Sequence, residues 1–168
     1  EFYDLLDSLG RLDTYTKLSM NDYKALQDAD VVITAFGDIK ALADGGNRFL
    51  EYSFNCQQAK QVGTALKEAG FHGVLINISN PCDVITGLLQ HYTGLSRQQV
   101  FGTGTFLDTA RMQRAVSMSL DQNPHNIAGY VLGEHGESQF AAWSTITVQG
   151  EPITEIAKDQ HLELSELD

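Results

Sequence analysis

Short apolar runs that alternate with helix-like patterns constrain the fold of this 168-residue chain most strongly. One run, DADVVITAFG, has Val31–Ile33 at its centre, and the next is VLINI at 74–78. Unbroken apolar runs of this length are typical of strands buried on both faces of a parallel sheet. Between them, Arg48 to Ala69 carries apolar residues at helical spacing, and Gly70 is the usual end of such a helix. This alternation predicts an α/β fold with a doubly wound parallel sheet.

The pattern changes after about residue 102. SNPCDVITGLLQHY predicts a helix with Ser79 or Asn80 as its N-cap. Its expected buried face is Val84, Ile85, Leu88, Leu89 and Tyr92. QVFGTG predicts a third strand, and LDTARMQRAVSMSL predicts the helix after it. From Ile127 onward we expect antiparallel strands, including one at 145–148 that alternates in polarity. A second domain therefore follows the doubly wound sheet.

Composition argues against several classes of function. The formal net charge is −11, and no run rich in Lys and Arg is present to neutralise phosphates, so nucleic acid is not an expected partner. No apolar run is long enough to span a bilayer, and EFYDLLDSLG lacks the features of a secretory signal. Cys56 and Cys82 lie far apart in apolar-periodic stretches, which fits a reduced, cytoplasmic protein. Both ends look like interrupted helices, so we expect the middle of a longer protein.

Polar residues with chemical potential follow the predicted strands. Asp108 and Arg111 are three residues apart at the start of a helix, which places them on one face. A pair of this kind is most often a surface ion pair, but this helix follows a strand end, where open α/β sheets bind ligands. GEHGES at 133–138 surrounds His135 with glycines, and this indicates either a proton-transfer group or a polar loop. Asn80 follows another strand end and suits a helix cap, a ligand contact or both.

No metal site is expected from the sequence. The side chains that could ligate a metal form no HxxxH or CxxC spacing; they are Cys82, His72, His91, His125 and His161. Ser138 is near His135 but lies outside any GxSxG elbow. GTGT at 102–105 lacks the pattern of a phosphate-binding loop.

A series of motifs resembles the L-2-hydroxy acid dehydrogenases, the family of the L-lactate and malate dehydrogenases. The motifs are VVITAFG, NRF, ISNPCDVIT, GTGTFLDTARMQ and LGEHGES, in that order over residues 31–138. HGVLINISNPCDVIT, GTGTFLDTARMQRAV and GYVLGEHGESQFAAWST are most similar to the lactobacillal L-2-hydroxyisocaproate dehydrogenases. The resemblance implies a Rossmann sheet whose first strands, with their GxGxxG turn, are absent from this chain. It makes residues 1–102 the later part of a dinucleotide-binding domain and residues 103–168 the start of an α+β substrate domain.

The resemblance also implies a role for each matching residue. His135 matches the catalytic acid/base, and Asp108 matches the carboxylate that orients its imidazole. Arg111 matches the arginine that holds the substrate carboxylate, and Arg48 the mobile-loop arginine that polarises the substrate carbonyl. Asn80 matches the asparagine that borders substrate and nicotinamide. NAD is the implied cofactor, and its expected contacts are Thr34, Ala35, Phe36, Gly37, Ile78, Asn80 and Thr103. The family resemblance also implies a homotetramer.

The implied reaction is reversible hydride transfer between NADH and a 2-keto acid. The loop DIKALADGGN at 38–47 lacks the second arginine of malate dehydrogenases, so we expect an apolar substrate such as 2-hydroxyisocaproate. L-lactate or malate is the alternative substrate. An NAD-dependent glycosidase of the same fold is a further alternative; it would need metal-ligating Cys and His near the nicotinamide, for which Cys82 is the hint. The last alternative is an inactive fragment that folds but does not bind the cofactor.

Overall fold

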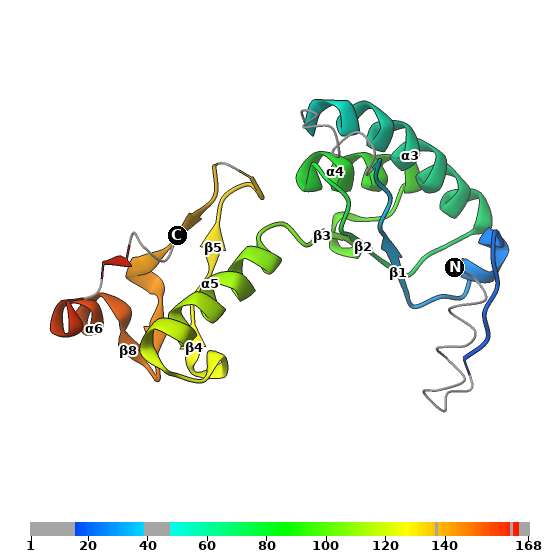
Figure 1. Cartoon of the computed structure of the whole chain (residues 1–168). Helices are drawn as coiled ribbons and strands as arrows, with labels where there is room; N and C mark the ends of the chain where they lie inside the picture. The colour runs from blue at the N-terminus through cyan, green and yellow to red at the C-terminus, as the bar shows by residue number, and fades with distance from the viewer. Residues whose placement is uncertain (1–15, 39–47, 137, 162, 165–168) are drawn as a thin grey trace.

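The computed structural model describes residues 16–38, 48–136, 138–161 and 163–164 (Figure 1). Strands β1 (Val31–Thr34), β2 (Val74–Asn77) and β3 (Val100–Gly102) form a parallel sheet in the order β1-β2-β3. The register pairs Val31 with Val74 and Leu75 with Val100. The parallel sheet predicted from the apolar runs is confirmed.

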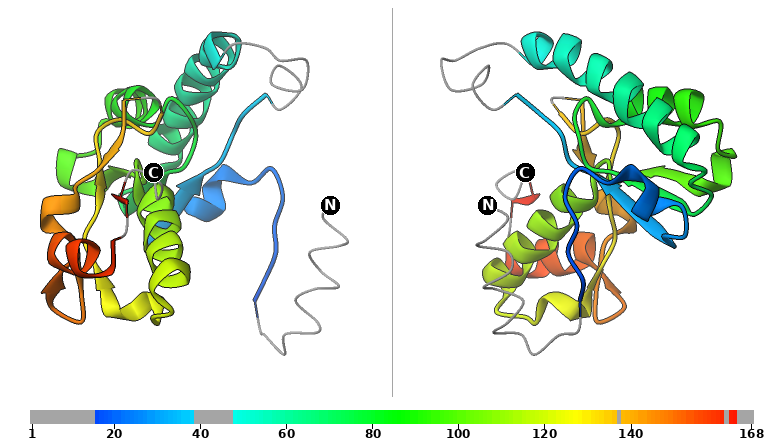
Figure 2. Two further views of the ribbon diagram at one scale, coloured as in Figure 1. Left: turned by 60° about the vertical axis from the view of Figure 1, so that its left-hand side comes forward. Right: turned by 90° about the vertical axis from the view of Figure 1, so that its right-hand side faces the viewer.

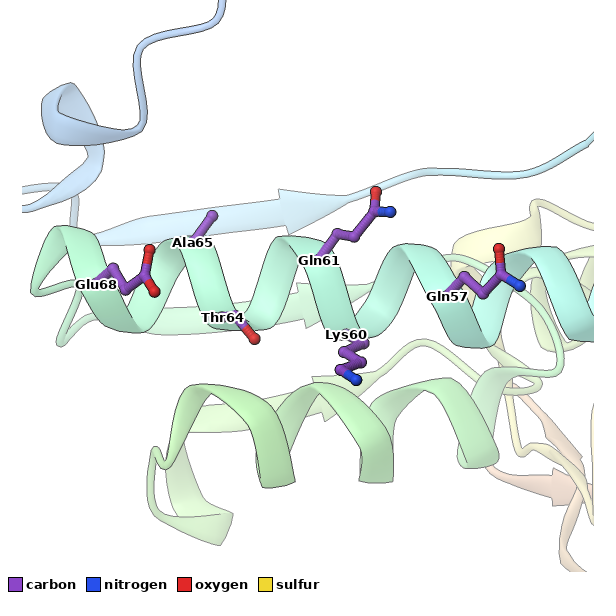
Figure 3. A pocket seen from close by; sticks show the side chains of 6 residues that line it. All are labelled: Gln57, Lys60, Gln61, Thr64, Ala65 and Glu68. Atoms are coloured by element: carbon purple, nitrogen blue, oxygen red, sulfur yellow. The ribbon is translucent and has the colours of Figure 1, made fainter.

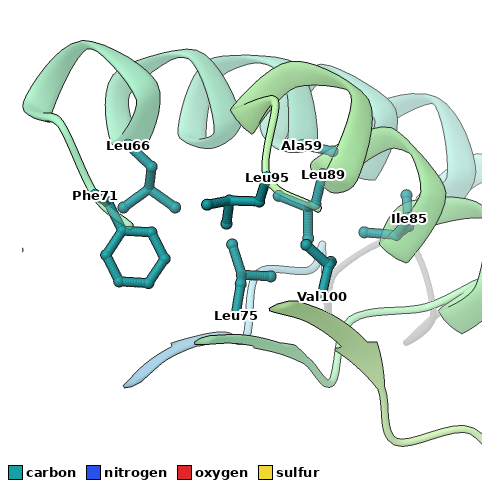
Figure 4. Packing of buried hydrophobic residues seen from close by; sticks show 8 residues of the cluster. All are labelled: Ala59, Leu66, Phe71, Leu75, Ile85, Leu89, Leu95 and Val100. Carbon is teal, nitrogen blue, oxygen red and sulfur yellow. The ribbon is translucent and has the colours of Figure 1, made fainter. Parts of the chain in front are cut away.

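Helices α3 (Arg48–Ala69) and α4 (Cys82–Thr93) pack on one face of this sheet. Gly70 ends α3 as predicted, with a φ of +82° that favours glycine. Figure 4 shows the buried cluster between the helices and the strands; its members are Ala59, Leu66, Phe71, Leu75, Ile85, Leu89, Leu95 and Val100. These side chains hold the sheet to its helices by excluding apolar surface from water.

The first strand is not buried on both faces, and this prediction is wrong for the described chain. Val31 is 50% exposed and Ile33 is 61% exposed. Phe101 on β3 is also 49% exposed. In the part of the chain that the structure describes, α3 and α4 cover only one face of the sheet, so these apolar side chains keep contact with solvent.

The second half of the chain has its own core around α5 (Phe106–Leu120) and α6 (Ile153–Gln160). The antiparallel strands are β4 (Ile127–Ala128), β5 (Val131–Leu132), β6 (Phe140–Ala141), β7 (Thr147–Val148) and β8 (Glu151–Pro152). They pair as β4-β7-β8 and as β5-β6. Their buried cluster is Met112, Val116, Ile127, Val131, Ile146, Val148 and Ile153. Figure 2 shows α5, α6 and these strands gathered together in both turned views.

Some local predictions are wrong. Pro81 is the N-cap of α4, with no side-chain hydrogen bond, so neither Ser79 nor Asn80 caps this helix. On α4 the predicted burial of Ile85 and Leu89 is confirmed, but Val84 is exposed, and Cys82 and Thr93 complete the buried face. The expected strand at 145–148 is shorter, because Trp143–Thr145 forms a 3-10 helix before β7.

A single buried amide fixes the ends of the strands. Asn77, the last residue of β2, is fully buried. Its Oδ1 accepts hydrogen bonds from Thr34 Oγ1 at 3.1 Å and from the Ser79 backbone N–H at 3.0 Å. Its Nδ2 donates to the carbonyls of Ser79 and Cys82 and to Thr86 Oγ1, at 3.0, 3.2 and 3.1 Å. Asn77 therefore joins β1, β2 and the start of α4, because a buried polar group needs partners on all its sides.

We expect Asn77→Asp to lower the free energy of unfolding by about 3–5 kcal/mol near neutral pH, because it buries an unpaired charge. A carboxylate oxygen would replace Nδ2 and face the carbonyls of Ser79 and Cys82. Asn126→Asp makes the same change of charge at an exposed position and serves as the control. Urea unfolding of both variants measures the difference, and equal losses would contradict the role of Asn77.

Candidate active site

The candidate site is built around Asp108 and His135, which are 27 residues apart in sequence. The Nδ1 atom of His135 lies 2.5 Å from Oδ2 of Asp108. Because a carboxylate only accepts hydrogen bonds, Nδ1 carries the proton in this pair. The Asp108 side chain is 7% exposed and that of His135 is 19% exposed. The second ring nitrogen, Nε2, is therefore the one that can exchange a proton with a bound molecule.

Arg111 lies beside the same carboxylate. Its Nη1 donates to Oδ1 of Asp108 at 3.3 Å, across one turn of α5. The Arg111 side chain is 67% exposed, so a guanidinium with five donors still presents N–H groups to solvent. The structure thus brings together Asp108, Arg111 and His135.

The environment of Asp108 favours its charged form. Burial raises the pKa of the Asp108 carboxyl. The hydrogen bond from His135, the charge of His135 and the neighbouring Arg111 lower this pKa by more than burial raises it, so the net shift is downward. The carboxylate is consequently ionised throughout the neutral range. An ionised carboxylate holds the imidazole in one orientation and one tautomer.

Gly133 shapes the turn that carries His135. Its φ is +98°, a region that side chains rarely adopt. A Cβ at this position would lie 2.8 Å from the carbonyl oxygen of Ser138. The glycine therefore lets the chain double back after β5, which leads His135 to the helix that carries Asp108.

The residues predicted to contact a cofactor lie along one edge of the parallel sheet. The Ile78 N–H donates to the Thr34 carbonyl, and the Thr103 N–H donates to the Asn77 carbonyl, both at 3.0 Å. Parallel pairing therefore continues past the ends of the strands and brings Thr34, Ile78 and Thr103 to the same edge. Thr34 is buried, whereas Ile78 and Thr103 are exposed.

The segment after β1 continues this edge. Ala35 and Gly37 are exposed and Phe36 is half-buried. Thr34, Ala35 and Phe36 also line a hollow of about 430 Å³ beside β1. Another hollow, of about 490 Å³, lies along α3 (Figure 3) and is lined by Gln57, Lys60, Gln61, Thr64, Ala65 and Glu68. The hollow along α3 contains no predicted site residue, so we do not assign it to the site.

Sequence reasoning missed Asn55, which positions the backbone at Asn80. Asn55 is fully buried in α3, and its Nδ2 donates to the Asn80 carbonyl at 2.7 Å. Among the described residues its Oδ1 has no partner. The signal in the sequence was an amide on the apolar stripe of α3 that continues through Ala59 and Leu66.

The side chain of Arg48 and residues 39–47 of the predicted loop lie outside the described residues.

Cys82 contacts the link between the two halves of the chain. The Gly104 N–H donates to Cys82 Sγ at 3.2 Å, and a Cβ on Gly102 would lie 2.7 Å from the same sulfur.

Across the described ranges, no group of three or more His, Cys, Asp or Glu is arranged to hold a metal ion. In the same ranges, no helix has the length and apolar character needed to cross a membrane.

Comparison with known proteins places the chain among dehydrogenases. Residues 1–102 match the NAD binding domain of lactate/malate dehydrogenase, and residues 105–167 match the α/β C-terminal domain of the same family. L-lactate dehydrogenase of Mycoplasma capricolum is 37% identical over 166 residues, which cover 98% of this chain and 52% of that protein. The chain therefore spans about half the length of the curated relatives it matches.

Solved structures agree with this match. The minor L-lactate dehydrogenase of Enterococcus mundtii in its ligands-bound form has a TM-score of 0.88 at 34% identity, over 98% of this chain and 53% of that one. Lactate dehydrogenase of Eimeria maxima with NADH and oxamate has a TM-score of 0.81 at 28% identity, over 98% and 50%. The expected α/β fold and the family resemblance are both confirmed.

We expect acid to weaken the fold partly through Asp108. The unfolded carboxyl has a pKa of about 3.9 and the folded one lies below it, so the stabilisation is full above about pH 5 and is lost as pH falls through the folded pKa. In Asp108→Asn the free energy of unfolding should therefore fall less steeply between about pH 5 and 2. Urea unfolding at several pH values measures both slopes. His135→Gln should flatten the slope as well, and parallel curves for wild type and both variants would refute this linkage.

Proposed function

Because the chain belongs to the lactate/malate dehydrogenase family, we propose that the natural protein containing it is an NAD-dependent L-2-hydroxy acid dehydrogenase. The reaction is reversible hydride transfer between NADH and a 2-keto acid. One observation carries the proposal: a histidine bonded at 2.5 Å to a buried carboxylate, beside an exposed arginine. This arrangement supplies a proton and a carboxylate-binding group, the pair that reduction of a keto acid needs.

In this proposal residues 1–102 are the later part of the dinucleotide-binding domain and residues 103–168 the start of the substrate domain. The family match over both parts favours a dehydrogenase over the glycosidase alternative. A homotetramer and a cytoplasmic location belong to the same proposal. The homotetramer rests on family resemblance, and the location rests on the two free thiols, Cys56 and Cys82.

The strand ends fit NAD in chemical character. Exposed Ile78, Ala35 and Gly37 offer small or apolar surface for a flat ring, and the exposed Thr103 offers a hydroxyl. We assign the cofactor contacts to Thr34, Ala35, Phe36, Gly37, Ile78, Asn80 and Thr103. NAD, when bound, supplies or accepts the hydride. Ligands bind at this carboxyl edge in open α/β sheets, and this general rule supports the assignment.

Two arginines are assigned to the substrate. Arg111 binds the substrate carboxylate through parallel hydrogen bonds, which its planar guanidinium makes possible and which fix the face that meets the hydride. Arg48, at the start of α3, polarises the keto oxygen as negative charge develops there. Asn80 borders the substrate, and the bond from Asn55 fixes the backbone of Asn80.

His135 is assigned as the acid/base. Hydride added to the keto carbon leaves negative charge on its oxygen, and the protonated imidazole gives that oxygen a proton from Nε2. Nδ1 stays bonded to Asp108 throughout, so the carboxylate stabilises the imidazolium and keeps the ring in place. In the direction of oxidation the neutral ring accepts the proton at the same nitrogen.

We expect His135→Asn to lower 2-keto acid turnover by about 10²–10⁴ in the natural protein, because proton transfer is lost. NADH affinity should stay close to that of wild type, since the proposed cofactor contacts lie on the sheet edge. Steady-state kinetics and fluorescence titration with NADH measure the two effects. His125→Asn, at an exposed histidine, is the control. Near-normal turnover of His135→Asn would rule out this assignment.

The proposed substrate carries an apolar side chain, as in 2-hydroxyisocaproate. The loop sequence supports this, because Ile39, Ala41, Leu42 and Ala43 stand where malate dehydrogenases have an arginine. An oxaloacetate carboxylate buried there without a partner would cost several kcal/mol, about 3 or more. A branched side chain would instead gain ~0.8 kcal/mol per buried methylene. The relatives are named L-lactate dehydrogenases, so pyruvate is the competing substrate.

We expect kcat/KM to be highest for 2-ketoisocaproate, lower for pyruvate and lowest for oxaloacetate. Competition kinetics on the natural protein measure this order. Lys40 is the cation in the loop that could attract a second carboxylate, so Lys40→Ala is the matched variant. It should leave the order unchanged. Highest efficiency on oxaloacetate would overturn the substrate proposal and leave the reaction type standing.

A further inference from the structure

We propose that Thr105 and Thr109 are positioning residues that hold the segment carrying His135 against the helix carrying Asp108. The Thr105 Oγ1 donates to the Val131 carbonyl at 2.6 Å. The Val131 N–H donates to Thr109 Oγ1 at 3.0 Å. The N-cap residue Thr105 and the α5 residue Thr109 thus bind both backbone polar groups of Val131 in β5. The catalytic consequence rests on the proposed function, whereas the clamp itself rests on these contacts.

The helix presents the two hydroxyls on one face. Thr105 is the N-cap of α5, and Thr109 follows it by four residues, about one helical turn. An N-cap threonine usually accepts a hydrogen bond from the first turn of its own helix. Thr105 makes no such cap bond, and its hydroxyl is used on the strand instead. Thr109 is buried, so water does not readily replace Val131 as its partner.

Strand β5 needs partners on the side that faces α5. Its other side pairs with β6, through Val131 with Ala141 and Leu132 with Phe140. In the described part of the chain, no second strand pairs with β5. Val131 is buried, and buried backbone N–H and C=O groups require hydrogen bonds. The threonine hydroxyls take the place of a neighbouring strand.

The clamp acts on the site because both ends of it adjoin the site. Asp108 directly precedes Thr109 on α5, and His135 follows Val131 after the turn at Gly133. The Thr109–Val131 and Asp108–His135 bonds therefore join the same two segments of chain. If β5 shifts along α5, the 2.5 Å contact lengthens, and small misplacements of catalytic groups have large effects on rate.

The test compares Thr109→Val, which removes the hydroxyl and keeps the shape, with Thr109→Ser, which keeps the hydroxyl. ¹⁵N chemical shifts of the His135 ring, recorded where the imidazole is neutral, report the fraction with the proton on Nδ1. We expect the Nδ1–H tautomer to dominate in wild type and in Thr109→Ser, and the ratio of Nδ1–H to Nε2–H to fall about two- to tenfold in Thr109→Val as one hydrogen bond is lost. Thr145→Val is the control, because Thr145 Oγ1 donates to Ala142 O at 2.8 Å in an exposed turn.

Thr105→Val gives a second reading at a half-buried position and replaces Thr109→Val if that variant does not fold. An unchanged Nδ1–H fraction in the folded valine variants would overturn the clamp, even if all of them were less stable. Turnover of a 2-keto acid by the natural protein separates the two proposals. If the valine variants lose the Nδ1–H form but the wild-type protein does not turn over any 2-keto acid, the proposed function is refuted and the clamp stands. If the wild-type protein turns over the 2-keto acid but the Nδ1–H fraction is unchanged in the valine variants, the clamp is refuted and the proposed function stands.

Discussion

The hydrogen bond between Asp108 and Nδ1 of His135 is the interaction on which the candidate site depends. A carboxylate that is 7% exposed loses most of its hydration, so it needs partners that favour its charge. His135 and Arg111 provide them on different carboxylate oxygens. The same contact gives the imidazole a defined tautomer, with Nε2 as the nitrogen available for proton exchange. Stability and chemistry thus depend on one geometry.

The packing of the second core keeps that geometry in place. Met112 and Val116 of α5 pack with Val131 and Ile146, which fixes the helix against the antiparallel strands. The Val131 carbonyl also accepts a hydrogen bond from the Thr105 hydroxyl, and the Val131 N–H donates one to the Thr109 hydroxyl. Apolar burial sets how close the elements lie, and the directional bonds set how one slides along the other.

The parallel sheet provides the other surface of the proposed site in a similar way. Asn77 joins the ends of β1 and β2 to the start of α4, and the aligned ends leave Ile78 and Thr103 exposed at one edge. Asn55 then fixes the Asn80 carbonyl from α3. Buried amides therefore determine where the exposed, ligand-facing residues lie. Asn55 lies outside the motifs that carry the family resemblance, whereas Asn77 lies within HGVLINISNPCDVIT.

Sequence patterns predicted the local elements better than the contacts between them. The apolar runs gave β1 and β2, and Gly70 gave the end of α3, because these features depend on nearby residues. Exposure of Ile33 could not be read from its run, since burial of a second face requires a covering layer elsewhere in the chain.

The site shows the same limit. The spacing of three predicted the Asp108–Arg111 pair, whereas only resemblance to a family joined Asp108 to His135 across 27 residues. The roles of Asn55, Thr105 and Thr109 are bonds to backbone groups of distant segments, and such bonds leave little trace in composition or periodicity.

A double-mutant cycle between Asp108 and His135 tests the central claim most directly. Unfolding free energies are measured at neutral pH for wild type, Asp108→Asn, His135→Asn and the double variant. A charged hydrogen bond predicts a coupling energy of about 1.5–3 kcal/mol, so the double variant should lose much less than the two single losses added together. Losses that add to within about 0.5 kcal/mol would show that the two side chains act independently and would contradict the account.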